Sequence, residues 1–175
     1  MYDVAHRESS LRLDVLKKWK LDSKIFVETG SNTGKGIEVA LMANFEKIIS
    51  FDVEEKFINF CRKKFSKFDN VDLILGDSSQ CLLENIKNVN QKLLFWLDGH
   101  ADYSIPLLKE LEQIKNLNKK DHIIMIDDVR MFEHPLWNGL KQKDVINKII
   151  EINKNYQFSY EDSANGKRDI LIAHF

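Results

Sequence analysis

A buried strand that runs through a glycine-rich turn into a helix constrains this chain more than any other stretch. Residues 25–27 are apolar and are followed by Glu28, by glycines at 30, 34 and 36, and by apolar residues with helical spacing. Glycine lets the backbone approach a ligand closely, and the N-terminus of a helix presents N–H groups without partners in the helix. This order predicts a turn that binds a nucleotide or nucleoside group in an α/β protein.

Two common phosphate-binding motifs are absent from this turn. The dinucleotide motif G-x-G-x-x-G needs glycine where the chain has Asn32. The phosphate loop G-x-x-x-x-G-K-[ST] fails because only three residues separate Gly30 from Gly34 and because Gly36, not a hydroxyl residue, follows Lys35.

The order acid-x-Gly-x-x-x-Gly, formed by Glu28, Gly30 and Gly34, resembles motif I of the class I S-adenosylmethionine-dependent methyltransferases. That family usually has a further glycine at the position of Asn32, and asparagine accepts a positive φ better than most residues. The resemblance implies that the acid organises the turn. It also implies that the turn passes under the amino-acid part of the cofactor, with Gly30, Ser31, Asn32, Thr33 and Gly34 as binding residues.

The rest of the chain predicts one doubly wound α/β domain over residues 1–175. Apolar strands alternate with helical patterns, which specifies a mostly parallel sheet. The last two strands are joined by a link too short for a helix, so they pair antiparallel. The predicted strands lie near 25–27, 47–52, 71–75, 92–98, 122–128, 156–161 and 168–174. A seven-stranded, mostly parallel sheet with an antiparallel C-terminal strand is the topology of the Rossmann-like methyltransferase domain. Ser9 or Ser10 is expected to cap a first helix.

The composition narrows the class of partner. With 26 basic and 27 acidic side chains, the formal charge is −1, so no basic field indicates nucleic acid. No apolar run is long enough to cross a membrane. Cys61 and Cys81 are isolated, which favours reduced thiols and a cytoplasmic location. No appended substrate domain is evident, which predicts a small-molecule acceptor, with no nucleic acid and no membrane as partner.

Each of the first five predicted strands ends in an acid. Ligands of open α/β sheets bind beyond the carboxyl ends of the strands, where Asp52 can accept hydrogen bonds from both ribose hydroxyls. In the methyltransferase family, the position of Asp77 and Ser78 contacts the adenine. The alternative is that acids simply favour strand ends and helix caps. The five acidic ends are Glu28, Asp52, Asp77, Asp98 and the pair Asp127-Asp128.

The segments 95–103 and 123–132 resemble the metal-dependent small-molecule and sugar O-methyltransferase branch of the family. By position, this resemblance implies that Asp98, Asp127 and Asp128 hold Mg²⁺, with Asp98 also bordering the cofactor. A hard divalent ion prefers oxygen ligands, and it lowers the pKa of a bound hydroxyl group. The alternative is that Asp127 and Asp128 cap a turn and orient Arg130.

His100 is the candidate general base because it lies in a loop at the active edge of the sheet and histidine exchanges protons near neutral pH. Tyr103 either positions the substrate or packs under this loop. The apolar loop 129–140 is either a substrate lid or the contact of a homodimer.

The sequence therefore predicts an enzyme that transfers a methyl group from S-adenosylmethionine to an oxygen of a small molecule such as a sugar or a secondary-metabolite precursor. Rate enhancement would come mostly from alignment of the reacting groups. Two alternatives stay open: an N-methyltransferase that acts on a small amine, and a nucleotide-binding module of this fold without catalysis.

Overall fold

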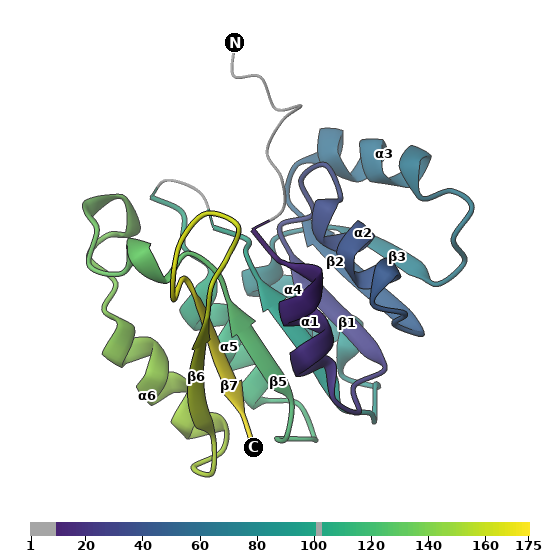
Figure 1. Ribbon diagram of the computed structural model, residues 1–175. Helices are drawn as coiled ribbons and strands as arrows, with labels where there is room; N and C mark the ends of the chain where they lie inside the picture. The colour runs from purple at the N-terminus through teal and green to yellow at the C-terminus, as the bar shows by residue number, and fades with distance from the viewer. Residues whose placement is uncertain (1–9, 101–102) are drawn as a thin grey trace.

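One mixed sheet forms the centre of the computed structural model, which describes residues 10–100 and 103–175. Its strands are β1 Ile25–Thr29, β2 Lys47–Asp52, β3 Val71–Leu75, β4 Leu93–Leu97, β5 Ile123–Ile126, β6 Gln157–Glu161 and β7 Ile170–His174. They form a seven-stranded sheet in the order β3-β2-β1-β4-β5-β7-β6 (Figure 1). Strands β1 to β5 are parallel, and β7 runs antiparallel to both β5 and β6. The predicted topology is confirmed.

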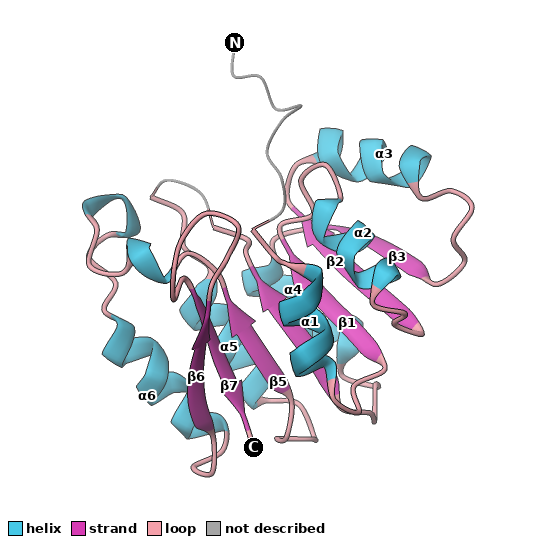
Figure 2. Ribbon diagram, viewed as in Figure 1, coloured by secondary structure: helices cyan, strands magenta, loops and turns pink. Residues whose placement is uncertain are grey.

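Helices cover both faces of the sheet (Figure 2). They are α1 Leu13–Lys20, α2 Lys35–Met42, α3 Glu55–Lys64, α4 Ser78–Ile86, α5 Leu107–Lys115 and α6 Gln142–Ile152. Helices α1 to α3 contribute to one core cluster and α4 to α6 to the other. Because β1, β4 and β5 are buried on both faces, every one of their side chains needs an apolar or hydrogen-bonded environment. This explains their nearly continuous apolar sequences.

The start of α1 differs from the prediction. The helix begins at Leu13 with Arg12 as its N-cap, and no side chain caps it. Ser10 instead donates a hydrogen bond to Asp127, far along the chain, so its predicted role as helix cap is wrong. Ser9 lies outside the described residues. The local pattern favoured a cap, but a buried carboxylate provides the stronger acceptor for this hydroxyl.

Both cysteines are free thiols, with Cys61 buried and Cys81 half-buried. Within the described ranges, no helix combines the length and the apolar character that crossing a membrane requires.

Candidate active site

A cavity of about 880 Å³ lies at the carboxyl ends of the central strands. Its lining includes Glu28 near the end of β1, Gly30 after β1, Asp52 at the end of β2, Asp98 after β4 and Asp127 after β5. The strand order reverses between β1 and β4, which is where open α/β sheets bind their ligands. The fold thus brings the acids of four strand ends to one place.

The glycine turn is fastened to the end of β2. The N–H groups of Gly30 and Ser31 donate to the Phe51 carbonyl oxygen at 2.8 and 3.0 Å. The Asn32 N–H donates to Asp52 Oδ2 at 2.8 Å, and the Glu54 N–H donates to Asp52 Oδ1 at 2.8 Å. Asn32 has a φ of +44°, as its place in a glycine position of the motif suggests. Asp52 therefore holds the turn in shape and also lines the cavity.

Gly30 is required by its surroundings as well as by its backbone. Its φ is +86°, and a Cβ atom there would lie 2.4 Å from the carbonyl oxygen of Asp98. Gly30→Ala is expected to destabilise the fold by about 2–5 kcal/mol, because left-handed strain adds to overpacking against backbone. Chemical denaturation measures this change. Gly139→Ala is the matched control, since Gly139 has a φ of +66° but nothing within 4 Å of the added Cβ. Equal losses in the two variants would contradict the packing argument.

Glu28 lies beneath the turn and is fully enclosed, with 2% of its surface exposed. Ser50 Oγ donates to Glu28 Oε2 at 2.5 Å, and Ser31 Oγ lies 2.7 Å from Ser50 Oγ. Burial raises the pKa of Glu28 to about 8, although the Ser50 hydrogen bond opposes this rise. A Cβ atom at Gly36 would come within 1.7 Å of Glu28 Oε1. This carboxyl group therefore supports the turn from below, as the resemblance implied for the motif's acid.

The raised pKa of Glu28 predicts a pH-dependent stability. Between its ordinary pKa of 4.5 and about 8, the folded chain keeps a proton on Glu28 that the unfolded chain loses. Stability from this group is complete below the ordinary pKa and declines as the pH rises towards 8. Relative to Glu28→Gln, the wild type is expected to lose about 2–3 kcal/mol between pH 5 and pH 7. Denaturation of both proteins at both pH values measures this difference, and a constant difference would contradict the prediction.

A second group of charged side chains follows β4 and β5. His100 Nε2 lies 2.9 Å from Asp128 Oδ2 and 3.6 Å from Asp98 Oδ1. Arg130 Nη2 lies 2.6 Å from Asp128 Oδ1, and the same guanidinium pairs with the buried Asp169. His100 is thus held between two carboxylates at the cavity wall.

The acids of this group differ in their charge state. Burial and the charges of Asp127 and Asp128 raise the pKa of Asp98 well above its usual value. Burial and the neighbouring Asp128 also raise the pKa of Asp127 to about 6. Burial opposes ionisation of Asp128 too, but the His100 hydrogen bond and the Arg130 charge hold its pKa below the usual value. Asp128 is therefore the acid of this group that most readily keeps its negative charge, beside His100 and Arg130.

Asp127 carries an unsatisfied polar atom. Its side chain is 2% exposed, Ser10 donates to Oδ2, and Oδ1 has no hydrogen-bond partner among the described residues. Buried carboxylate oxygens normally have partners, so an unpaired one at a cavity wall indicates a place for a cation or a donor.

Two sets of side chains have metal-ligand spacing. The ligand atoms of Asp98, His100 and Asp128 lie within 4.8 Å of one another, as do those of Asp127, Asp128 and Asp169. The three predicted ligands, Asp98, Asp127 and Asp128, do not form such a set by themselves in the described part of the chain. Asp128 belongs to both sets. The first set fits a divalent ion better, since Arg130 and Ser163 already bind Asp169.

An aromatic contact fixes His100 from the other side. The His100 and Trp137 ring centroids are 4.4 Å apart, and Trp137 is 2% exposed. Trp137 also packs against Phe132 at 5.5 Å. The Tyr103 N–H donates to the Leu136 carbonyl oxygen at 2.8 Å, which joins the segments after β4 and β5. The loop 129–140 is thus anchored by a buried tryptophan.

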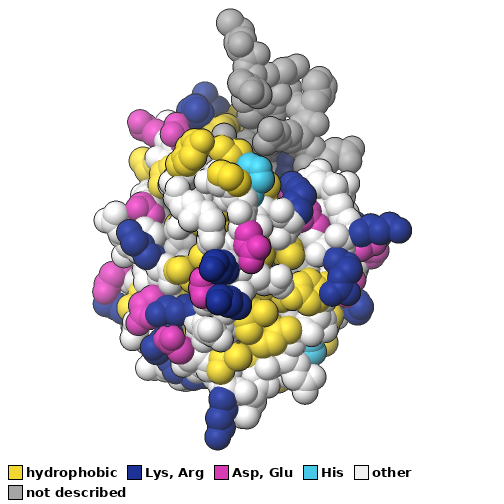
Figure 3. Space-filling model, turned by 90° about the vertical axis from the view of Figure 1, so that its left-hand side faces the viewer, with side chains coloured by type: hydrophobic (Ala, Val, Ile, Leu, Met, Phe, Trp, Pro, Cys, Tyr) yellow, Lys and Arg dark blue, Asp and Glu magenta, His cyan; other side chains and the backbone are white. Residues whose placement is uncertain are grey.

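The outer side of this loop is apolar. Figure 3 views the molecule from the side of α6 and shows apolar side chains gathered beside a histidine at the top of the face. Met131, Phe132 and Leu136 are half-buried and His134 is exposed. Whether this surface is a lid or a dimer contact stays a prediction.

Four predicted site residues do not line the cavity, namely Gly34, Tyr103, Asp77 and Ser78. Tyr103 is 67% exposed. Asp77 caps α4 by accepting the Ser79 N–H at 2.9 Å, as the alternative reading proposed. Ser78 is buried and donates to Glu110 Oε1 at 2.5 Å.

Sequence reasoning did not assign several residues that do line the cavity. They are Ser10, Lys35, Gly36, Val53, Glu54, Phe57, Trp96, Gly99, Arg130 and Asn165. Asn165 lies between β6 and β7, so its place at the carboxyl edge of the sheet is the signal that could have identified it. Ser10 has no comparable signal, because its contact with Asp127 spans most of the chain.

Comparison with known proteins supports the fold. No protein-family model matches the chain. No curated protein matches its sequence. The chain is similar in structure to a methyltransferase from Podospora anserina with bound S-adenosylhomocysteine, at a TM-score of 0.64 and 14% identity, over 93% of this chain and 75% of that one. It is similar to CalS11, a TDP-rhamnose 3'-O-methyltransferase of calicheamicin biosynthesis. The TM-score is 0.65 and the sequence identity is 18%, over 93% of this chain and 76% of CalS11. It is also similar to an rRNA methylase from Streptococcus thermophilus, with a TM-score of 0.58 and a sequence identity of 18%, over 93% of this chain and 92% of that one. At these identities the likeness is one of fold, and that fold is the one predicted from the sequence.

Proposed function

Because the chain has the fold of class I S-adenosylmethionine-dependent methyltransferases, we propose that it transfers a methyl group from S-adenosylmethionine to a hydroxyl oxygen of a small molecule. One observation carries this proposal. A single cavity holds a glycine turn with Asp52 in one part and the charged group Asp98, His100 and Asp128 in another. Cofactor binding and acceptor activation therefore have separate residues within reach of one another.

The cofactor part of the cavity suits a nucleoside with an amino-acid tail. Asp52 keeps lone pairs free beyond its two backbone hydrogen bonds, which ribose hydroxyls can occupy. Val53 and Phe57 provide an apolar wall beside it. The turn from Gly30 to Gly34 lets the amino-acid part approach the backbone. S-adenosylmethionine supplies the electrophilic methyl group when bound. The adenine contact of Asp77 and Ser78 remains a proposal that these geometries do not support directly.

His100 is the proposed general base. If Nε2 donates to Asp128 Oδ2, the lone pair of Nδ1 is free to accept the proton of the acceptor hydroxyl. Asp128 fixes this tautomer and stabilises the imidazolium that forms, and the Trp137 ring limits the orientations of the imidazole. His100 and Asp128 thus act as a base and its orienting carboxylate.

The charged group also fits a divalent cation. With a cation bound, His100 would be a ligand instead of the base: Asp98, His100 and Asp128 would supply two oxygen ligands and one nitrogen ligand, and Asp127 Oδ1 is unpaired beside them. When bound, Mg²⁺ would lower the pKa of the acceptor hydroxyl. A dependence of the activity on metal would favour O-methylation over N-methylation, because a neutral amine is nucleophilic without a metal.

A polar acceptor fits the cavity lining better than an apolar one. Beside the charged group, the cavity is bordered by Ser10, Arg130 and Asn165, which offer donors and acceptors of hydrogen bonds. We propose that the acceptor is a hydroxylated small molecule such as a sugar. The proposal also includes a cytoplasmic location for the protein.

Calorimetric titration with S-adenosylhomocysteine, with and without Mg²⁺, tests the proposed function first. Micromolar binding is expected. A second step measures S-adenosylhomocysteine release from S-adenosylmethionine with a panel of hydroxylated and amine acceptors. Folded protein that does not bind S-adenosylhomocysteine would overturn the proposal, and turnover only with amines would replace it with N-methylation.

A further inference from the structure

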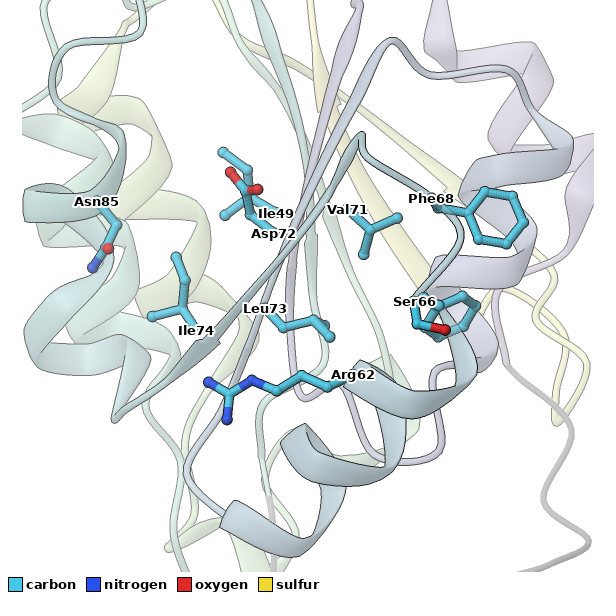
Figure 4. A pocket seen from close by; sticks show the side chains of 10 residues that line it. Ile49, Arg62, Ser66, Phe68, Val71, Asp72, Leu73, Ile74 and Asn85 are labelled. Atoms are coloured by element: carbon cyan, nitrogen blue, oxygen red, sulfur yellow. The ribbon is translucent and has the colours of Figure 1, made fainter.

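A second hollow lies along the outer edge of the sheet. The glycine turn separates it from the charged group Asp98, His100 and Asp128. The hollow has a volume of about 560 Å³ and follows β3, between α3 and α4. In Figure 4 the strand, with Leu73 and Ile74, passes between Arg62 and Phe68 on one side and Asn85 on the other. The hollow is therefore a groove that runs along an open strand.

The backbone of this strand has unused hydrogen-bonding groups. The Asn70 carbonyl oxygen accepts the Ile48 N–H at 2.8 Å, and the Gly76 N–H donates to the Asp52 carbonyl oxygen at 2.9 Å. Even-numbered residues of the strand thus face β2. Since backbone groups alternate along a strand, Leu73 and Leu75 direct their N–H and C=O groups outward. No strand in the described part of the chain lies on that side.

The rim of the groove carries uncompensated positive charge. Arg62 donates to Asn59 Oδ1 at 3.2 Å and makes no ion pair among the described residues. Lys63 and Lys67 do not line the groove themselves but are chain neighbours of Arg62, Ser66 and Phe68, which do. Both lysines are exposed and have no carboxylate partner in the described ranges. By contrast, Lys64 pairs with Glu38 at 3.0 Å and Lys47 pairs with Asp72 at 2.6 Å. The whole chain is nearly neutral, so its net charge does not reveal this local excess.

Large apolar side chains are exposed on α3, on β3 and on the loop that joins them. Phe60 is 50% exposed, and Phe68 and Leu75 are each 45% exposed. An open strand edge flanked by apolar and basic side chains is a template for an added strand.

We propose that the β3 edge is a docking site for an extended, acidic segment of a partner protein, which adds to the sheet as a further strand. The partner backbone would pair with Leu73 and Leu75, its apolar side chains would pack near Phe68, and its acids would meet Arg62, Lys63 and Lys67. A second copy of this chain fits less well, because edge-to-edge pairing would bring the same cations of both chains together. This site is independent of methyl transfer.

The test uses a capped peptide of about eight residues that alternates glutamate and valine, which is a usual strand length. Amide hydrogen exchange of Leu73 and Leu75 is expected to slow at least about tenfold at saturating peptide, since both N–H groups gain partners. Exchange of Asp72 and Ile74 is expected to change little, because their N–H groups already face β2. Unchanged exchange at Leu73 and Leu75 in millimolar peptide would overturn the proposal.

Charge reversal tests the role of the rim. Lys63→Glu/Lys67→Glu is expected to weaken peptide binding by about tenfold or more, because two attractive contacts become repulsive. The control Lys17→Glu/Lys143→Glu makes the same charge change at exposed lysines elsewhere and is expected to stay within about twofold. Equal effects of the two pairs, or equal binding of a lysine–valine peptide, would contradict the proposed charge complementarity.

Leu73→Pro tests the backbone contact. Proline removes the outward N–H and is tolerated on an edge strand, so circular dichroism is expected to stay unchanged while the peptide loses its effect on Leu75 exchange. Leu73→Val is the matched control, since it keeps the N–H group. Binding that survives Leu73→Pro, or that a single-stranded oligothymidylate reproduces with the same lysine dependence, would replace strand addition with a nucleic-acid site. Protection of Leu73 and Leu75 without peptide, rising with protein concentration, would assign the edge to a second copy.

Discussion

Replacing Asp128 by asparagine is expected to slow methyl transfer by about 100- to 10,000-fold, the range for loss of a positioned acid–base group. Asp128 accepts from His100 Nε2 at 2.9 Å and pairs with Arg130 at 2.6 Å. Asparagine cannot stabilise the imidazolium with a full charge, and its amide can turn the wrong group towards His100. It does keep the backbone, because asparagine tolerates the φ of +57° that this position adopts.

The affinity for S-adenosylhomocysteine is expected to stay within about threefold in Asp128→Asn, since the lost charge acts on the acceptor. Turnover is measured as S-adenosylhomocysteine release with the best acceptor of the panel, and affinity by calorimetry. Asp144→Asn is the control, because Asp144 is an exposed acid on α6. Unchanged turnover in Asp128→Asn would exclude the proposed His100–Asp128 unit.

Asp52→Ala is expected to weaken S-adenosylhomocysteine binding by about 30- to 150-fold, or about 2–3 kcal/mol, from the loss of hydrogen bonds to a charged group. The change removes the acceptors of the Asn32 and Glu54 N–H groups, both at 2.8 Å, and so loosens the glycine turn. It also removes the proposed ribose contacts.

Calorimetry of Asp52→Ala, with Asp144→Ala as control, measures this loss, and circular dichroism verifies the fold. The comparison with Asp128→Asn matters most. Equal losses of cofactor affinity in the two site variants would show that the division of the cavity into a cofactor part and an acceptor part is wrong.

The fold was predictable because its strands are buried on both faces. A parallel strand such as β4 needs apolar side chains in both directions, so its sequence is apolar without interruption. The start of α1 was not predictable in the same way. A serine before an apolar helical pattern is a usual cap, but Ser10 reaches a carboxylate that only the tertiary structure brings near.

The site was predictable as far as strand ends determine it. Parallel strands bring their carboxyl ends to one edge, which explains why Asp52, Asp98 and Asp127 meet around one cavity. Asp77 also ends a strand, yet it accepts the Ser79 N–H and caps α4. Sequence cannot decide between these two uses of an acid, because both require the same position. Trp137 packs against His100 from a distant loop, and no local pattern indicates such a contact.

The hydrogen bond from Tyr103 to Leu136 and the contact between Trp137 and His100 join the segments that follow β4 and β5. Protein engineers who wish to give this scaffold a new acceptor would therefore have to transplant both segments from one donor. A chimaera with only one of these segments would lose both contacts and misplace the imidazole of His100. In natural relatives of this chain, the sequences of the two segments are therefore expected to change together during evolution.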